Sequence, residues 1–423
     1  MERLLVTGGA RCAGTVRVAG AKNSALKLMA AALLAPGRTV LHDVPHIQDC
    51  LTMGEVLDRL GAGVAWRHGS VTIDATELTS VEAPYDLVRR MRASTAVLGS
   101  LLARAGRARV AMPGGDEIGS RPIDLHVQGL RKMGAEISSE HGFLVASTPG
   151  LHGAAITLDY PSVGATENLM MAAVLARGTT AIDNAAREPE IADIAMFLAA
   201  MGARIDGAGT STIEIEGVDA LEPAEHTTIP DRIEAGTWAA AAVATRGDVT
   251  LENARPDHLD LFLQKLADAG AEVVMTEAGL RITQPRRASA IDFVTLPYPG
   301  VATDFQPILM AMLATADGTS IATENVFEGR FLYVDELRRM GADIRTEGHH
   351  AVIRGVDRLS GAPVRALDIR AGAAMTIAAL AADGVSEISD LHHLDRGYEG
   401  FVTKLRALGV EATRVDEPAL RLP

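Results

Sequence analysis

Cysteine and aromatic residues are scarce in this chain of 423 residues. The two cysteines, Cys12 and Cys50, match no zinc-binding spacing and cannot form a disulfide framework, which indicates a reducing compartment. Aromatic residues make up 4% of the sequence and hydrophobic residues 48%, so we expect a largely aliphatic core. The start of the chain lacks the long apolar region of a signal peptide, and no apolar run reaches membrane-spanning length without glycine or charge. We therefore expect a soluble, cytoplasmic protein.

Basic residues are also fewer than acidic ones. The chain has 40 Lys and Arg and 54 Asp and Glu, which gives a net charge of −14. This balance excludes an overall electrostatic attraction to nucleic acid or to an anionic membrane. Any anionic ligand must therefore be held by a local cluster of cations. The chain is too long for one typical core, which predicts two domains or more.

Two glycine-containing motifs recur through the whole sequence. The first is the end of an apolar helix, a glycine, and then a β-prone segment; its glycines lie 68 to 73 residues apart, at Gly61, Gly134, Gly202, Gly270, Gly341 and Gly409. The second is an alanine-rich helix, a glycine and a strand, with spacings of 66 to 72 residues, at Gly37, Gly106, Gly178, Gly247, Gly318 and Gly384. The two motifs agree on six repeats of about seventy residues.

Each repeat has the composition of an α/β unit. The glycines fall where helix C-caps are expected, and β-branched residues typical of strands follow them. The alanine-rich helices are apolar on nearly every side, which predicts that they are buried all round. The repeats therefore predict a structure with helices inside and sheets outside.

The segment 112–126, MPGGDEIGSRPIDLH, has the composition of an active-site loop. Gly114 and Gly115 permit unusual backbone conformations, Asp116 supplies a carboxylate, and Arg121 can bind phosphate or carboxylate in a bidentate manner. An ordinary surface loop would explain the same residues. Polar residues collect in the equivalent loop of every repeat, which favours a role in chemistry.

Nine segments in order along the chain resemble the family of UDP-N-acetylglucosamine enolpyruvyl transferases. They include AGAKNSALKLMAAALLA, the loop PGGDEIGSRPIDLH and PSVGATEN in the first half of the chain. The other six are NAAREPEI, PDRIEAGTWAAAA, TDFQP, ENVFEGRF, DIRAG and DRGYE, the last at 395–399. The shikimate-pathway enolpyruvyl transferase (EPSP synthase) shares the six-repeat architecture but has a different lysine motif at its start.

The resemblance implies the two-domain inside-out α/β barrel fold of the enolpyruvyl transferases, with three βαβαββ-like repeats in each domain. Residues 21–229 are expected to form the first domain, which carries the loop. Residues 1–20 and 230–423 are expected to form the second. Closure of the two domains would bring their cations together and exclude water.

The resemblance also implies a reaction. The enolpyruvyl group of phosphoenolpyruvate is transferred to the 3-hydroxyl of UDP-N-acetylglucosamine, and phosphate leaves through a tetrahedral intermediate, in the first committed step of peptidoglycan synthesis. No metal or organic cofactor takes part. The expected partners are these two small molecules, with no nucleic acid or membrane, and the oligomeric state stays open.

Particular residues carry the roles that the resemblance implies. Asp304 takes the proton of the sugar hydroxyl, Asp116 is the acid, and Lys22, Arg121 and Arg396 clamp phosphoenolpyruvate. The other expected substrate-binding residues are Asn23, Arg92, Pro122, Ile123, Asp124, Leu125, Ser162, Val163, Gly164, Val326, Arg330 and Arg370, with Glu188, Asp231 and Glu328 in support. Without the resemblance, Lys22 reads as a solvated first-turn lysine, the arginines as surface ion pairs, and Glu188 and Glu190 as helix caps.

Asp116 departs from the usual family pattern, in which a cysteine at this position is alkylated by fosfomycin. Aspartate can still donate a proton if its pKa is raised, but it is a much poorer nucleophile toward an epoxide. The sequence therefore predicts an active transferase that resists fosfomycin. Gln48 and Tyr160 replace lysines that some relatives carry.

Two other functions compete with this interpretation. One is an enolpyruvyl transferase that acts on another nucleotide in secondary metabolism, which would alter the 121–124 and 162–164 segments. The other is a non-catalytic regulator that binds UDP-sugar, which would have lost residues such as Lys22 or Asp304. Both segments and both residues are present.

Overall fold

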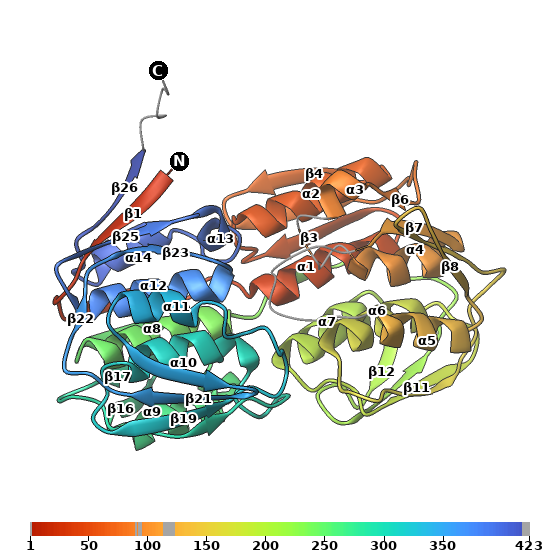
Figure 1. The fold of residues 1–423 in the computed structure, drawn as a ribbon. Coiled ribbons are helices and arrows are strands. Elements are labelled where there is room, and N and C mark those ends of the chain that lie inside the picture. Colours follow the sequence, from red (N-terminus) through yellow and green to blue (C-terminus); the bar gives the residue numbers. More distant parts are fainter. Residues whose placement is uncertain (1, 89–90, 92–94, 113–122, 417–423) are drawn as a thin grey trace. The chain divides into compact units, whose positions relative to one another are not determined.

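The computed structural model describes residues 2–88, 91, 95–112 and 123–416. The described residues form two compact units (Figure 1). The first unit begins at Gly20 and ends at Ile229, and the second unit combines the residues up to Ala19 with those from Pro230 onward. Each unit has its own buried apolar core.

Three four-stranded sheets surround the core of the first unit, and all have the same strand order. An edge strand runs parallel to its neighbour, and two antiparallel strands follow. The sheets are β14(Glu225–Thr227)-β3(Arg38–His42)-β5(Ser70–Asp74)-β4(Gly63–Arg67), β6(Glu82–Ala83)-β7(Arg107–Ala111)-β9(Phe143–Ser147)-β8(Glu136–Glu140) and β10(Ala155–Thr157)-β11(Thr179–Asp183)-β13(Thr212–Glu216)-β12(Arg204–Asp206).

The second unit repeats this arrangement. Its sheets are β16(Glu272–Thr276)-β17(Gly279–Thr283)-β15(Asp248–Glu252)-β2(Ala13–Arg17), β18(Phe293–Val294)-β19(Thr319–Thr323)-β21(His350–Arg354)-β20(Asp343–Glu347) and β23(Pro363–Arg365)-β25(Val385–Ser389)-β1(Glu2–Thr7)-β26(Ala412–Asp416). A two-stranded sheet pairs β22(Leu359–Ser360) with β24(Ala382–Asp383). In the third sheet the N-terminal strand β1 lies between β25 and β26. In the other five four-stranded sheets, the strand at this position comes from the same repeat as its neighbours in the antiparallel part of the sheet.

The strands alternate between buried and exposed side chains. In β13, Ile213 and Ile215 are fully buried while Thr212, Glu214 and Glu216 are exposed. One face of each sheet therefore covers the core, and the other faces solvent. Apart from a short helix at Tyr85–Val88, the described residues run in the order β6, α4(Val97–Ala105), β7, α5(Asp124–Lys132), β8, β9, a βαβαββ repeat, which confirms the repeat that the sequence predicts.

Three alanine-rich helices form the centre of each unit (Figure 1). They are α1(Lys22–Ala31), α4(Val97–Ala105) and α6(Val163–Ala173) in the first unit, and α8(Arg232–Ala244), α10(Gln306–Leu313) and α12(Ile369–Leu380) in the second. Every residue of α12 is buried, as the sequence predicts for helices that are apolar on all sides. Among the described residues, no helix has both the length and the apolar character needed to cross a membrane.

Six amphipathic helices accompany the sheets: α2(Gln48–Leu60), α5(Asp124–Lys132), α7(Pro189–Ala200), α9(Asp260–Asp268), α11(Val334–Arg339) and α14(Phe401–Ala407). A glycine of the first motif follows each of them, and all six glycines have φ between 77° and 104°. This left-handed conformation ends each helix without the steric cost of a Cβ. Two short helices, α3(Tyr85–Val88) and α13(His392–Asp395), complete the set in the described residues.

The prediction that the second set of glycines caps helices is wrong for most of its members. Gly106 is the C-cap of α4, but α6 ends at Ala173, well before Gly178. After α1 a short 3₁₀ turn, Ala32–Leu34, separates the helix from Gly37. Near Gly247 the residue with positive φ is Arg246. These glycines mostly serve turns that lead into the next strand.

Candidate active site

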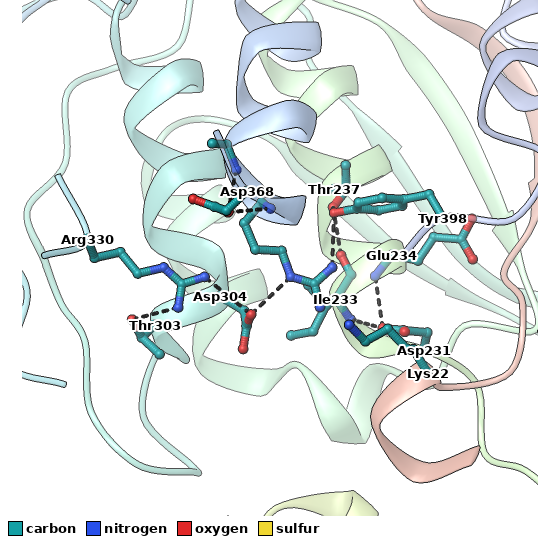
Figure 2. Close-up of polar contacts among 12 residues, drawn as sticks. Lys22, Asp231, Ile233, Glu234, Thr237, Thr303, Asp304, Arg330, Asp368 and Tyr398 are labelled. Atoms are coloured by element: carbon teal, nitrogen blue, oxygen red, sulfur yellow. Dashed lines mark hydrogen bonds and ion pairs between the residues drawn. The ribbon is translucent and has the colours of Figure 1, made fainter. Parts of the chain in front are cut away.

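Asp304 lies between two buried arginines in the second unit. It is the middle residue of the 3₁₀ turn Thr303–Phe305, directly before α10. Its Oδ1 accepts a hydrogen bond from Nε of Arg370 at 2.9 Å and lies 3.4 Å from Nη2 of Arg330 (Figure 2). The Arg330 and Arg370 side chains are 3% and 5% exposed, whereas that of Asp304 is 30% exposed. These arginines are therefore not the surface ion pairs that the sequence alone left open.

The two arginines set the charge of Asp304. Burial by itself would raise the pKa of Asp304, but the guanidinium of Arg370, then that of Arg330 and the more distant Arg232, hold the pKa well below its usual range. Asp304 is therefore ionised at neutral pH. Its side chain is partly exposed, and the charges of the arginines around it are positive.

The backbone that carries these groups is firmly anchored. Phe305 is 2% exposed, stacks on Phe262 at 4.2 Å, and lies so close to α8 that a Cβ on Gly236 would be 2.3 Å from its ring. Glycine at position 236 is what allows this approach. On the other side, the carboxylate of Asp368 caps α12 by accepting the backbone N–H groups of Arg370 and Ala371 at 2.7 and 2.9 Å.

Tyr398 holds the far end of the Arg370 guanidinium. Nη1 of Arg370 donates to the Tyr398 hydroxyl at 3.2 Å, and this hydroxyl lies 2.9 Å from Thr237 Oγ1, which itself donates to the carbonyl of Ile233 (Figure 2). The threonine proton is used, so the tyrosine must donate to Thr237. Burial raises the pKa of Tyr398, which keeps the phenol protonated for this role.

Lys22 lies at the start of α1 in the first unit. Its side chain is 10% exposed, and Nζ lies 2.8 Å from Oδ2 of Asp49 on α2, whose side chain is 4% exposed. The structure therefore contradicts the solvated first-turn lysine that the sequence alone favoured. Among the residues that the structure describes, no side chain caps the N-terminus of α1 at Ala21, so the first-turn amides add positive character at this end of the helix, beside Lys22. Asn23 follows on the same turn and is partly buried.

The first unit brings the two segments expected to bind the nucleotide side by side. Ile123 is the N-cap residue of α5, and Asp124 and Leu125 are the first residues of that helix. Ser162 is the N-cap residue of α6, and Val163 and Gly164 are its first residues; the two helices pack together. The buried His126 joins them. Its Nδ1 lies 3.0 Å from Nδ2 of Asn168, and its ring lies 3.3 Å from where a Cβ of Gly164 would be. Ser162 caps α6 through the amide of Ala165.

Glu167 is a fully buried carboxylate in the core of the first unit. Oε2 lies 2.6 Å from Nζ of Lys27, and the side chain is 1% exposed. Burial, and to a lesser extent Glu190 and Glu188, raise the pKa of Glu167 to about 7 despite Lys27. Glu188 occupies the N-cap position of α7 but makes no capping hydrogen bond through its side chain, and Glu190 lies in the first turn. The capping interpretation of Glu188 is therefore wrong.

The remaining expected residues are spread over both units or lie outside the description. Val326 and Arg330 come from the segment between β19 and α11, and Arg396 is partly buried at the C-cap of α13, which packs on α12. Arg92, Asp116, Arg121 and Pro122 lie outside the described residues. The residues that the sequence did not assign are Asp49, Glu324 and Tyr398. Glu324 and Tyr398 lie within ENVFEGRF and DRGYE, two segments that resemble the family. That position in the sequence could have marked them as candidate site residues.

The chain matches a known family over nearly its whole length. A family model described as EPSP synthase (3-phosphoshikimate 1-carboxyvinyltransferase) matches residues 6–405. The chain therefore belongs to this family of carboxyvinyltransferases. Two solved structures agree with the fold: the enolpyruvyl transferase NikO from Streptomyces tendae, at 27% identity and a TM-score of 0.89 over 99% of both chains, and EPSP synthase from Acinetobacter baumannii, at 18% identity and 0.77 over 98% and 100%.

More similar relatives define the branch of the family. A UDP-N-acetylglucosamine 1-carboxyvinyltransferase of Corynebacterium jeikeium is 54% identical over 98% of this chain and 99% of its own. The proteins of that name from Carboxydothermus hydrogenoformans (number 2) and Mycobacterium tuberculosis are 54% and 53% identical, over 99% and 98% of this chain and 100% and 99% of theirs. Within the family, the chain is thus a member of the UDP-N-acetylglucosamine 1-carboxyvinyltransferases. This confirms the resemblance and the fold predicted from the sequence.

Proposed function

We propose that the protein transfers the enolpyruvyl group of phosphoenolpyruvate to the 3-hydroxyl of UDP-N-acetylglucosamine and thereby starts peptidoglycan synthesis in the cytoplasm. The observation that carries the proposal is the Asp304 carboxylate held between Arg330 and Arg370, three residues that the chain brings together from distant segments. The identity of 53–54% to relatives of that name supports the choice of substrates. Cys12 and Cys50 are buried and are not joined by a disulfide in the part of the chain that the structure describes, which fits a reducing compartment.

In the proposed reaction, the sugar oxygen bonds to C2 of phosphoenolpyruvate while C3 gains a proton. The tetrahedral intermediate then returns a proton from C3 to Asp116 while the bond between C2 and the phosphate oxygen breaks, and phosphate leaves with the proton that Asp304 took from the hydroxyl. Asp304 accepts the proton of the hydroxyl, and Asp116 donates the proton to C3. Lys22, Arg121 and Arg396 bind the anionic groups of phosphoenolpyruvate, and the 121–125 and 162–164 segments bind the nucleotide sugar.

The arginines around Asp304 bear on its strength as a base. A carboxylate whose pKa is held far below neutral accepts a proton only weakly. An anionic substrate group that approaches Arg330 or Arg370 offsets part of their charge, and the pKa of Asp304 then rises. We propose that binding of the anionic substrates in this way makes Asp304 a competent base.

The resistance to fosfomycin belongs to the same proposal. It follows from the aspartate at position 116, because a carboxylate is a much poorer nucleophile than a thiolate toward an epoxide. Resistance would leave the transfer reaction intact, since a carboxylic acid can supply the proton that C3 requires.

Phosphate release, together with the mass of the nucleotide product, tests the function. With phosphoenolpyruvate and UDP-N-acetylglucosamine, the wild type should release one phosphate for each enolpyruvyl nucleotide formed. Turnover only with another nucleotide would favour the specialised enzyme. Tight binding of UDP-N-acetylglucosamine without phosphate release would favour a regulator.

A further inference from the structure

We propose that Glu324 is a positioning residue for Asp304 and Arg330, and that it acts through the hydroxyl of Thr303. The proposal rests on the proposed function for its kinetic consequences. Glu324 directly follows β19, is 1% exposed, and holds three donors with its two carboxylate oxygens.

The three donors come from both segments that carry the Asp304 site. Oε1 accepts the backbone N–H groups of Val326 and Phe327 at 2.8 and 3.0 Å, which folds the start of the segment that leads to Arg330. Oε2 accepts the Thr303 hydroxyl at 2.9 Å, and Thr303 precedes Asp304 in the 3₁₀ turn. One carboxylate thus joins the turn of the base to the segment of its arginine.

The carboxylate also fixes the direction of the Thr303 proton. Thr303 donates its hydroxyl proton to Oε2 of Glu324 and so turns a lone pair elsewhere. Nη1 of Arg330, which can only donate, lies 3.4 Å from that oxygen, and Nη2 of the same guanidinium lies 3.4 Å from Asp304 (Figure 2). Thr303 therefore holds one arm of the guanidinium so that the other faces Asp304.

An amide at position 324 cannot reproduce this arrangement. A glutamine has one accepting oxygen and one donating NH₂ group for three donors. If its oxygen faces the amides of Val326 and Phe327, its NH₂ group faces Thr303, whose proton must then turn toward Arg330. If the side-chain amide is flipped, its NH₂ group faces the two backbone N–H groups, and donor meets donor. Either arrangement loosens Arg330 from Asp304.

The kinetic test uses two pairs of variants. Thr303→Val keeps the shape but removes the hydroxyl, and Thr303→Ser keeps the hydroxyl. Glu324→Gln is paired with Glu336→Gln, a buried glutamate whose Oε2 also accepts a backbone N–H, that of Arg365 at 3.2 Å. We expect Thr303→Val and Glu324→Gln each to lower kcat/KM by about 10- to 100-fold, chiefly through kcat, because each lets Asp304 and Arg330 leave the positions that the reaction needs, and this loss outweighs the gain in base strength as the pKa of Asp304 rises. Thr303→Ser and Glu336→Gln should stay within about threefold of wild type.

Two further kinetic readouts separate positioning from a general structural role. The kcat/KM of the double variant Thr303→Val/Glu324→Gln should lie no more than about threefold below that of the less active single variant. Both substitutions break the same connection from Glu324 through Thr303 to Arg330, so their effects should not add. In both single variants, the acidic limb of the pH profile of kcat/KM should move to higher pH. The pKa of Asp304 rises when Arg330 offsets less of its charge, although Arg370 and Arg232 still face it. Additive losses, an unchanged acidic limb, or an equal loss in Glu336→Gln would overturn the proposal.

Hydrogen exchange gives a readout that does not depend on activity. The amides of Val326 and Phe327 should exchange faster in Glu324→Gln than in the wild type or in Glu336→Gln, because their acceptor is weakened. Unchanged exchange at both amides would overturn the positioning role whatever the enzyme does. If the wild type releases no phosphate, the proposed function fails, and the exchange result still decides whether Glu324 organises this segment.

Discussion

Replacing Glu167, in the first unit, with glutamine should abolish the pH dependence that this residue gives to the free energy of unfolding. The wild-type carboxylate is fully buried, with Nζ of Lys27 at 2.6 Å, and its pKa is raised to about 7 from an ordinary value of 4.5. Between these two values the folded protein binds more protons than the unfolded chain. The stability that Glu167 contributes is therefore complete below pH 4.5 and is lost as the pH rises to 7.

The size of the effect follows from the shift. A difference of about 2.5 pKa units at 1.36 kcal/mol each amounts to about 3 kcal/mol. Glutamine resembles the protonated acid in shape and binds no proton. The wild type should thus be at least as stable as Glu167→Gln at pH 5, and should lose about 3 kcal/mol relative to the variant by pH 8.

Urea unfolding of both proteins between pH 4.5 and pH 8, followed by circular dichroism, measures this difference. Glu216→Gln provides a matched control in the same unit, because the Glu216 side chain is 56% exposed and pairs with Arg204 at the surface. Its difference from wild type should not change over the same range. A difference between wild type and Glu167→Gln that stays constant, or that grows with pH, would refute the reasoning.

Three other perturbations test separate parts of the account. Fosfomycin should leave the wild type active, whereas Asp116→Cys should lose activity with time as an adduct forms on the thiol; an adduct on Asp116 of the wild type would contradict this. Arg370→Met should move the acidic limb of kcat/KM to higher pH, because burial then acts on Asp304 with less opposing charge, and an unmoved limb would count against the assigned base. Ser162→Ala should cost about 1 kcal/mol in urea unfolding through loss of the cap on α6, and no change would show that the cap does not stabilise the helix.

The repeat architecture could be predicted because its signals are local. A glycine after an apolar helix end and an alanine-rich apolar helix depend on residues close in the chain, and both recur six times. The exact helix ends could not be predicted in the same way. At Gly37 and Gly178 the chain makes a further turn between the end of the helix and the glycine.

The residues of the candidate site were predictable through resemblance, but their partners were not. Asp49 lies 27 residues from Lys22, Tyr398 lies 28 from Arg370, and Glu324 lies 21 from Thr303. Only the folded structure decides which of several acidic or hydroxyl groups meets each cation. Glu167 shows the same limit, because its raised pKa comes from complete burial that no single segment of sequence specifies.

Turnover by Asp304→Asn tests the central claim most directly. Asparagine keeps the shape and the contact with Arg370 but cannot accept the proton of the sugar hydroxyl. With phosphoenolpyruvate and UDP-N-acetylglucosamine, the wild type should form equal amounts of phosphate and enolpyruvyl nucleotide, and Asp304→Asn should still bind both substrates while kcat falls by about 100-fold or more. A variant that turns over as fast as the wild type, or a wild type that forms no such product, would contradict the account.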